Sequence, residues 1–238
     1  MAIGAILLIL FYVRERSRKE PYIRFDLFRS RKYTAYIVAG FWMNAGIFGS
    51  IFLLTLFLQQ AQGYTALEAG IRTMAWTGCT MITAPLAGFA ITRFGNRIIL
   101  SIGLLFQGLA LIGFAWLISA VGIDIPFGYL APLMMLAGTG MGLSFTPLAH
   151  GVLSSVPEAS SGEASGVSNA TRELGGVFGI AICGLTFQSG AMIQTPTDFG
   201  IHLVPALWVS VAMISLGLTS LTLFAKEVYK RKELSSVA

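Results

Sequence analysis

Two ionisable residues, Arg172 and Glu173, stand side by side at the start of a long apolar run. At helical spacing they share a stripe with Asn169 and with glycines at positions 176 and 179. Ionisable side chains in an apolar environment should face the interior of a helix bundle or a wet cavity. The stripe therefore predicts a cavity or gate, with Asn169, Arg172 and Glu173 as its candidate residues.

The same pair fits a second interpretation, in which the helix starts deeper and the two charges lie at the edge of the apolar region. Residues Ser160 to Glu163 have the Ser-x-x-Glu form of a capping box, which could start the helix early. An early start favours the cavity or gate, and a late start favours a role at the interface.

Enzymatic chemistry has little support in the sequence. Ser144 and His150 could suggest a nucleophile and its base, but on one helix they lie about 120° away from a common face at 100° per residue. The run Gly138-x-Gly140-x-Gly142 lies in an apolar helix and lacks the strand that precedes a nucleotide-binding turn. No group of His, Cys, Asp or Glu has metal-ligand spacing. We therefore predict a protein that is not an enzyme and needs no cofactor or metal.

The composition points to an apolar solvent. Apolar residues make up 55% of the 238 residues and charged residues only 11%, less than half of the roughly 25% usual in soluble domains. The mean hydropathy is +0.75. A soluble globule of this size could not bury so many apolar side chains, so an ordinary cytosolic enzyme and a disordered chain are excluded. The two cysteines, Cys79 and Cys183, lie in apolar runs and are interpreted as small core residues.

Six apolar runs are long enough for a membrane-spanning helix, which needs about 20 residues. They cover residues 34–60, 69–92, 98–119, 129–156, 167–188 and 203–225. The predicted fold is therefore all-α, a polytopic membrane bundle of six helices at 34–225. Residues 1–13 are apolar but too short to cross and are interpreted as the remnant of a preceding transmembrane helix. A basic cytoplasmic loop at 14–33 and a cytoplasmic tail at 226–238 complete the predicted organisation.

The basic residues predict the orientation of these spans. Fourteen of the 16 Lys and Arg lie at 14–32, in the connection that carries Arg93 and Arg97, and in the tail. If the spans alternate, all three segments fall on one side, which is then cytoplasmic. An anionic lipid leaflet accounts for the net charge of +5, and nucleic acid is not a predicted partner.

Glycine and proline interrupt the predicted spans. Small residues let helix backbones approach closely in a membrane, and proline frees a backbone carbonyl and allows a bend. A bundle that changes shape and simple tight packing both fit this pattern. The candidate packing and bending residues are Pro85, Gly138, Gly142, Pro147, Gly175 and Gly179.

Polar uncharged residues occur in the other spans. Most are expected to form hydrogen bonds between helices. Asn44 and Gln107 are the two favoured as residues that line a pathway.

The connection from Gly88 to Arg97 reads Gly-Phe-Ala-Ile-Thr-Arg-Phe-Gly-Asn-Arg. It resembles the major facilitator cytoplasmic loop motif, G-x-x-x-D-R-x-G-x-R, on Gly88, Arg93, Gly95 and Arg97. In that family the loop latches the cytoplasmic side and steers the change of state. Thr92 replaces the usual acidic residue, so the charge latch is weakened in this copy.

Three further segments resemble the fourteen-span drug:proton antiporters of the EmrB/QacA type. They are residues 21–33, residues 59–72, and the glycine-rich region from 136 to 179. The resemblance runs in order along nearly the whole chain and covers only the C-terminal half of such a transporter.

The resemblance implies two inverted three-helix repeats and alternating access at a site shared with an N-terminal half. It implies export of drugs or other amphipathic small molecules against protons, across a bacterial inner membrane. The chain alone is then expected not to transport. A non-transporting structural or assembly protein of the membrane, or an inactive fragment, is the alternative.

Overall fold

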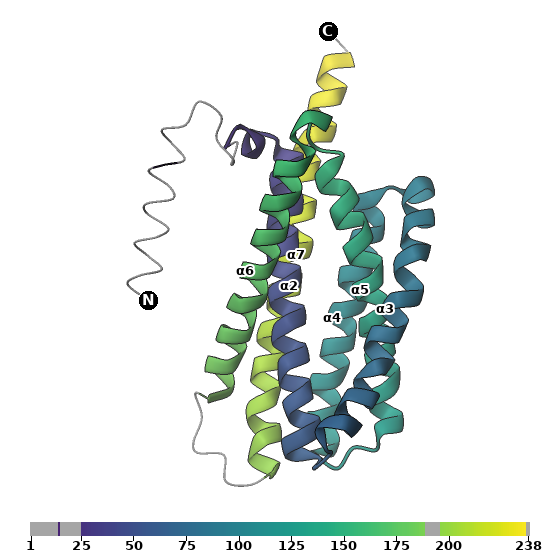
Figure 1. Cartoon of the computed structure of the whole chain (residues 1–238), viewed down its shortest axis with the longest axis vertical. Helices are drawn as coiled ribbons and strands as arrows, with labels where there is room; N and C mark the ends of the chain where they lie inside the picture. The colour runs from purple at the N-terminus through teal and green to yellow at the C-terminus, as the bar shows by residue number, and fades with distance from the viewer. Residues whose placement is uncertain (1–13, 15–24, 189–195, 237–238) are drawn as a thin grey trace.

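The computed structural model describes residues 14, 25–188 and 196–236 (Figure 1). The predicted helix remnant at 1–13 and residues 15–24 of the predicted basic loop lie outside the described residues. The described part contains no strand, and its long elements are all helical. The predicted all-α bundle is confirmed.

Six long helices make up the bundle. They are α2 (Arg31–Leu56), α3 (Ala66–Phe94), α4 (Asn96–Val121), α5 (Phe127–Leu153), α6 (Ser161–Gln188) and α7 (Pro196–Ser236). Three short elements join them: η1 (Phe25–Arg29), the π-helical turn η2 (Phe57–Ala61) and η3 (Glu158–Ser160).

Local sequence signals account for several helix ends. The Ser30 side chain accepts a hydrogen bond from the backbone N–H of Tyr33 at the start of α2. Thr65 and Glu68 form a reciprocal capping box at the start of α3. Gly95 ends α3 and Gly122 ends α4, both at positive φ (82° and 87°), where a side chain would strain the backbone.

Each predicted span corresponds to one helix, with differences at the ends. By length and composition, Arg31–Ala61, Ala66–Phe94, Asn96–Val121 and Asp198–Leu223 are apolar enough to cross a membrane. The helices α5 and α6 are as long but do not belong to this set; α5 contains Pro132 and Pro147, and α6 begins with small and polar residues. The helix α6 starts six residues before the predicted 167, and α7 extends beyond 203–225 at both ends.

The helices alternate in direction, so the two groups of three run in opposite senses (Figure 1). The first helix of each group packs mainly on the other group. The helix α2 packs on α6 and α7, while α5 packs on α3 and α4. Exchanging α2 with α5, α3 with α6 and α4 with α7 maps these contacts onto themselves. Two inverted three-helix repeats that complete each other produce this pattern.

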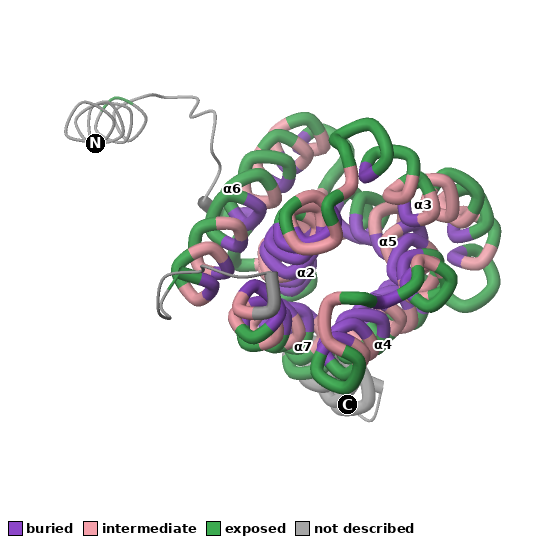
Figure 2. Tube along the Cα trace, turned by 90° about the horizontal axis from the view of Figure 1, so that it is seen from below, coloured by how far each residue is buried: buried purple, intermediate pink, exposed green. Residues whose placement is uncertain are grey.

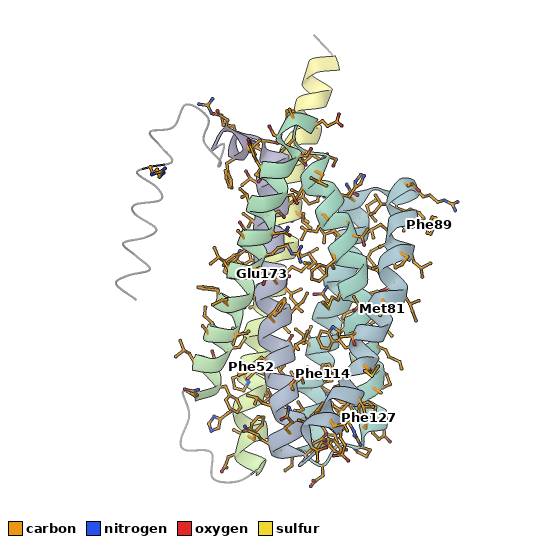
Figure 3. All side chains as sticks on the ribbon, viewed as in Figure 1. Phe52, Met81, Phe89, Phe114, Phe127 and Glu173 are labelled. Atoms are coloured by element: carbon orange, nitrogen blue, oxygen red, sulfur yellow. The ribbon has the colours of Figure 1, made fainter. Side chains whose placement is uncertain are left out.

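The bundle has two different sides (Figure 2). On one side, α2 and α5 lie between α6 and α3, and we call this side the open face. On the other side, α4 and α7 pack against each other and close the bundle. The helix α3 carries many exposed apolar side chains, and Figure 3 shows two of them, Met81 and Phe89, on its outer side.

Side-chain hydrogen bonds tie the connections together at each end of the bundle. We call the end that holds η1, Gly95 and the α5–α6 connection the basic end. There the Lys32 ammonium donates to the Ser154 carbonyl at 3.5 Å. At the opposite end, the Gln62 amide donates to the carbonyls of Ile123 and Ile125 at 3.1 and 2.9 Å. These bonds join the first repeat to the α4–α5 and α5–α6 connections.

Candidate functional site

The motif resembling a cytoplasmic loop forms a tight turn between α3 and α4. The Gly95 N–H donates to the Ile91 carbonyl at 2.8 Å, and its φ of 82° and ψ of 156° fall in a region that only glycine adopts readily. Arg93 and Arg97 are exposed beside it. The Thr92 hydroxyl donates to the Phe89 carbonyl at 2.7 Å, and this hydrogen bond lies within α3. Gly88 has open space around its Cα, which means that packing does not require glycine there.

A residue between the motif positions, Asn96, holds the turn to α5. Its Nδ2 lies 2.9 Å from Nδ1 of His150 in the last turn of α5. Sequence reasoning did not single out Asn96, because nothing local to either residue predicts that the two helix ends meet. Ser144 is wholly buried and donates to the Gly140 carbonyl at 2.7 Å, away from His150.

The candidate cavity residues fall into two groups. Asn44 on α2 is fully buried, and its Nδ2 donates to the Arg172 carbonyl on α6 at 3.0 Å. The Arg172 Nη1 donates to Asn169 Oδ1, one turn earlier, at 3.3 Å. Gln107 lies elsewhere, on the seam between α4 and α5, where its Nε2 donates to Ser144 Oγ at 3.0 Å. Asn44, Asn169 and Arg172 therefore form one polar cluster, and Gln107 does not belong to it.

The residues of the predicted stripe on α6 lie in two different environments. Gly176 and Gly179 are buried, whereas Asn169 and Glu173 are exposed. The glycines face α2, because a Cβ on Gly179 would overlap the Ala45 carbonyl and a Cβ on Gly176 would lie 3.3 Å from the Phe48 ring. Asn169 and Glu173 lie at the border of the open face, and Figure 3 labels Glu173 there.

Arg172 lies on α6 where that helix meets α2 and α5. Its guanidinium carbon is 4.6 Å from the centre of the Phe145 ring on α5. Its Cγ is close to Gly40 on α2, where a Cβ would be 3.3 Å away. Since α6 starts at Ser161, Arg172 is eleven residues inside the helix, which corresponds to about 17 Å along the axis. The helix α6 therefore has the early start, one of the two alternatives that the sequence left open.

Glycines in α5 and α6 allow close approach of neighbouring backbones. A Cβ on Gly138 would overlap the Trp76 carbonyl of α3, and one on Gly175 would overlap the Phe41 carbonyl of α2. A Cβ on Gly142 would overlap the Thr83 hydroxyl. Of the two prolines, Pro147 is buried and Pro85 is exposed.

Threonine hydroxyls connect α3 and α5 in both directions. Thr80 Oγ1 donates to the Gly138 carbonyl at 3.0 Å, and Thr83 Oγ1 donates to the Thr139 carbonyl at 3.4 Å. Thr146 Oγ1 on α5 returns a bond to the Ala84 carbonyl of α3 at 3.1 Å. Such bonds contribute about 0.6 kcal/mol each on average in a membrane, and together they hold α3 against α5.

An all-helical bundle built from two inverted three-helix repeats is the architecture of many membrane carriers. The Major Facilitator Superfamily family model matches residues 1–180. The chain belongs to the major facilitator superfamily.

Curated relatives are named as drug resistance and export proteins. Multidrug resistance protein Stp of Mycobacterium tuberculosis is 30% identical over 177 residues, which are 74% of this chain and 32% of the relative. Quinolone resistance protein NorB of Staphylococcus aureus is 28% identical over 216 residues, 90% of this chain and 45% of the relative. The Tetracenomycin C resistance and export protein of Streptomyces glaucescens is 28% identical over 179 residues, which are 75% of this chain and 32% of the relative. The chain thus spans less than half the length of these relatives.

Proposed function

We propose that this chain forms one half of a proton-coupled exporter of drugs or other amphipathic small molecules, working by alternating access. The second half is a six-helix bundle that covers the open face. The observation that carries the proposal is the polar cluster of Asn44, Asn169 and Arg172, which extends from the buried Asn44 to the exposed Asn169 at the border of that face, in a chain of this family. Relatives named for multidrug and quinolone resistance support the substrate class.

Exposed polar groups on the open face argue that the bundle is not surrounded by lipid there. Among the described residues, Glu173 is the only carboxylate more than ten residues from both ends of its helix, and it is exposed. A charged side chain at the centre of a bilayer costs about 3 kcal/mol or more unless water or a partner surrounds it. A second bundle would enclose Glu173 in a wet cavity, where its carboxylate could exchange the coupling proton.

We place the basic end in the cytoplasm of a bacterial cell, with the membrane crossed between the basic end and the opposite end. Arg29, Arg31, Lys32, Arg93 and Arg97 are at or beside the basic end, and positive residues accumulate on the cytoplasmic side of inner-membrane proteins. The Gly95 turn then faces the cytoplasm, where it would move with the change of state.

The chain expressed alone in a pump-deficient bacterium should leave ethidium efflux at the background rate. Half a carrier provides one wall of the site and no second body to rock against. Expression together with the N-terminal half of a relative such as NorB should restore efflux that stops when the proton gradient is collapsed. The Arg72→Gln variant, altered outside the polar cluster, is the matched control and should also be restored. Proton-driven efflux by the chain alone would contradict the proposal.

A further inference from the structure

Arg172 has more hydrogen-bonding capacity than its surroundings use. A guanidinium has five N–H donors. One of them has a partner, the Asn169 Oδ1 at 3.3 Å, and the buried Nε has none. No carboxylate of the described residues lies within 4.0 Å of this guanidinium. Glu173 is next in the chain, but it points about 100° around the helix and is exposed.

A small cavity of about 40 Å³ lies beside Arg172 between α5 and α6. Its polar lining comes from Ser165, Ser168 and Asn169, and its apolar lining from Leu148 and Val152. One water needs roughly 10–15 Å³ of such space, so the cavity has room for a few non-hydrogen atoms. It is far below the roughly 300–1,000 Å³ of a pocket for a whole drug. The cavity can therefore accept one polar head group and not an entire substrate.

The neighbouring aromatic rings extend from this cavity along the open face. The Phe145 ring stacks on the guanidinium at 4.6 Å, and the Phe48 ring lies against Gly176, one turn further along α6. Phe52, a further turn along α2, is exposed, and Figure 3 labels it. A cation at one end of an aromatic surface fits a flat amphipathic molecule with an anionic group at its edge.

We infer that Arg172 binds the carboxylate of an aromatic acid, with the carboxylate in the cavity between α5 and α6 and the ring system against Phe145 and Phe48. This rests on the proposed function, because it names the class of substrate that the proposed site takes. Arginine suits the role, since its planar fork binds both carboxylate oxygens and it stays charged when desolvated.

Binding of a matched pair of fluorescent probes to the purified chain in lipid nanodiscs tests this inference. The probes are 9-anthracenecarboxylate and the neutral 9-anthracenemethanol, which share one ring system. The native chain should bind the carboxylate about tenfold more tightly than the alcohol, as a charge-assisted contact provides. Arg172→Gln should remove the preference and leave binding of the alcohol unchanged. Equal affinities for the two probes in the native chain would overturn the inference.

Two further variants control for folding and for charge. Arg72→Gln removes another arginine stacked on an aromatic ring, that of Tyr64 at 3.7 Å, at the opposite end of the bundle, and should keep the full preference. Arg172→Lys keeps the charge but loses the fork, so the preference should fall to about threefold. If Arg172→Gln does not run as a single species on size exclusion, the Arg172→Lys variant becomes the test. An unchanged preference for the carboxylate in Arg172→Lys would then overturn the inference.

A carboxylate side chain of the second half of the transporter could pair with Arg172 in place of a substrate carboxylate. Transport by the assembled protein distinguishes these two partners. A substrate site predicts that Arg172→Gln lowers transport of 9-anthracenecarboxylate at least about tenfold more than it lowers efflux of cationic ethidium. Equal loss of both would show an ion pair between the halves and overturn the inference. If the assembled native protein exports neither compound, the proposed function fails, while the probe preference of the chain alone remains a separate result.

Discussion

Residues 1–122, produced without the rest of the chain, should accumulate in membranes several-fold less than the intact chain and should run as an aggregate on size exclusion. The first repeat cannot cover its own surfaces, because α2 packs on α6 and α7 while α3 packs on α5. Within the repeat, α3 and α4 make few contacts. Small losses of stability change cellular abundance several-fold, and here almost the whole interface is lost.

Residues 123–238 expressed from a second gene provide the control. The break falls directly after Gly122, in the connection between α4 and α5, so every helix remains intact. Co-expression should return residues 1–122 to a single species that co-purifies with residues 123–238. A folded, monodisperse product of residues 1–122 alone would contradict the exchange of packing partners between the repeats.

Gly179→Ala should destabilise the bundle by about 1–3 kcal/mol, the usual effect of adding volume to a well-packed core. The new Cβ would overlap the Ala45 carbonyl, and neither backbone can move without separating α2 from α6. For a domain of this size, a loss of 1 kcal/mol lowers the unfolding midpoint by roughly 2–4 °C. The thermal unfolding midpoint in detergent measures the effect.

Gly184→Ala is the matched control on the same helix. No atom lies within 4 Å of a Cβ at Gly184, and alanine is the better helix former, so the midpoint should stay or rise slightly. Equal midpoints for Gly179→Ala and Gly184→Ala would show that α2 and α6 do not approach as closely as the structure has them.

The sequence predicted the number and approximate position of the helices because the bilayer imposes a length and a composition on each span. Hydropathy put the start of α6 too late, at 167, since residues 161–166 are polar and small, whereas the Ser-x-x-Glu pattern from Ser160 to Glu163 had pointed to an early start. The helix continues there because a short 3-10 turn at Glu158–Ser160 leads directly into it. That early start leaves Arg172 eleven residues inside the helix.

The partners of individual residues depended on packing that the sequence does not encode locally. Asn44 and Gln107 look equivalent in the sequence, as single amides in apolar spans. The structure places Asn44 against α6, beside Arg172, and Gln107 against α5, beside Ser144. Helical spacing also grouped Glu173 with Gly179. A helix face about 100° wide is broad enough that one edge packs on α2, where Gly179 lies, while the other edge borders the open face, where Glu173 lies.

The central claim is that a second bundle turns the open face into a water-filled cavity, and cysteine labelling measures this directly. The measurement uses the assembled transporter with Cys79 and Cys183 replaced. Glu173 and Leu105 lie at a similar depth, because Leu105 lies between Gly103 and Gln107, which both contact Ser144 of α5, and Arg172 stacks on the next residue, Phe145. Glu173 borders the open face, whereas Leu105 is exposed on α4, one of the two helices that close the other side.

A membrane-impermeant maleimide needs a thiolate, and a thiolate needs water. We predict that Glu173→Cys reacts at least about tenfold faster than Leu105→Cys, and that substrate changes the rate at position 173 only. Equal, slow reaction at both positions would place Glu173 in lipid and contradict the account.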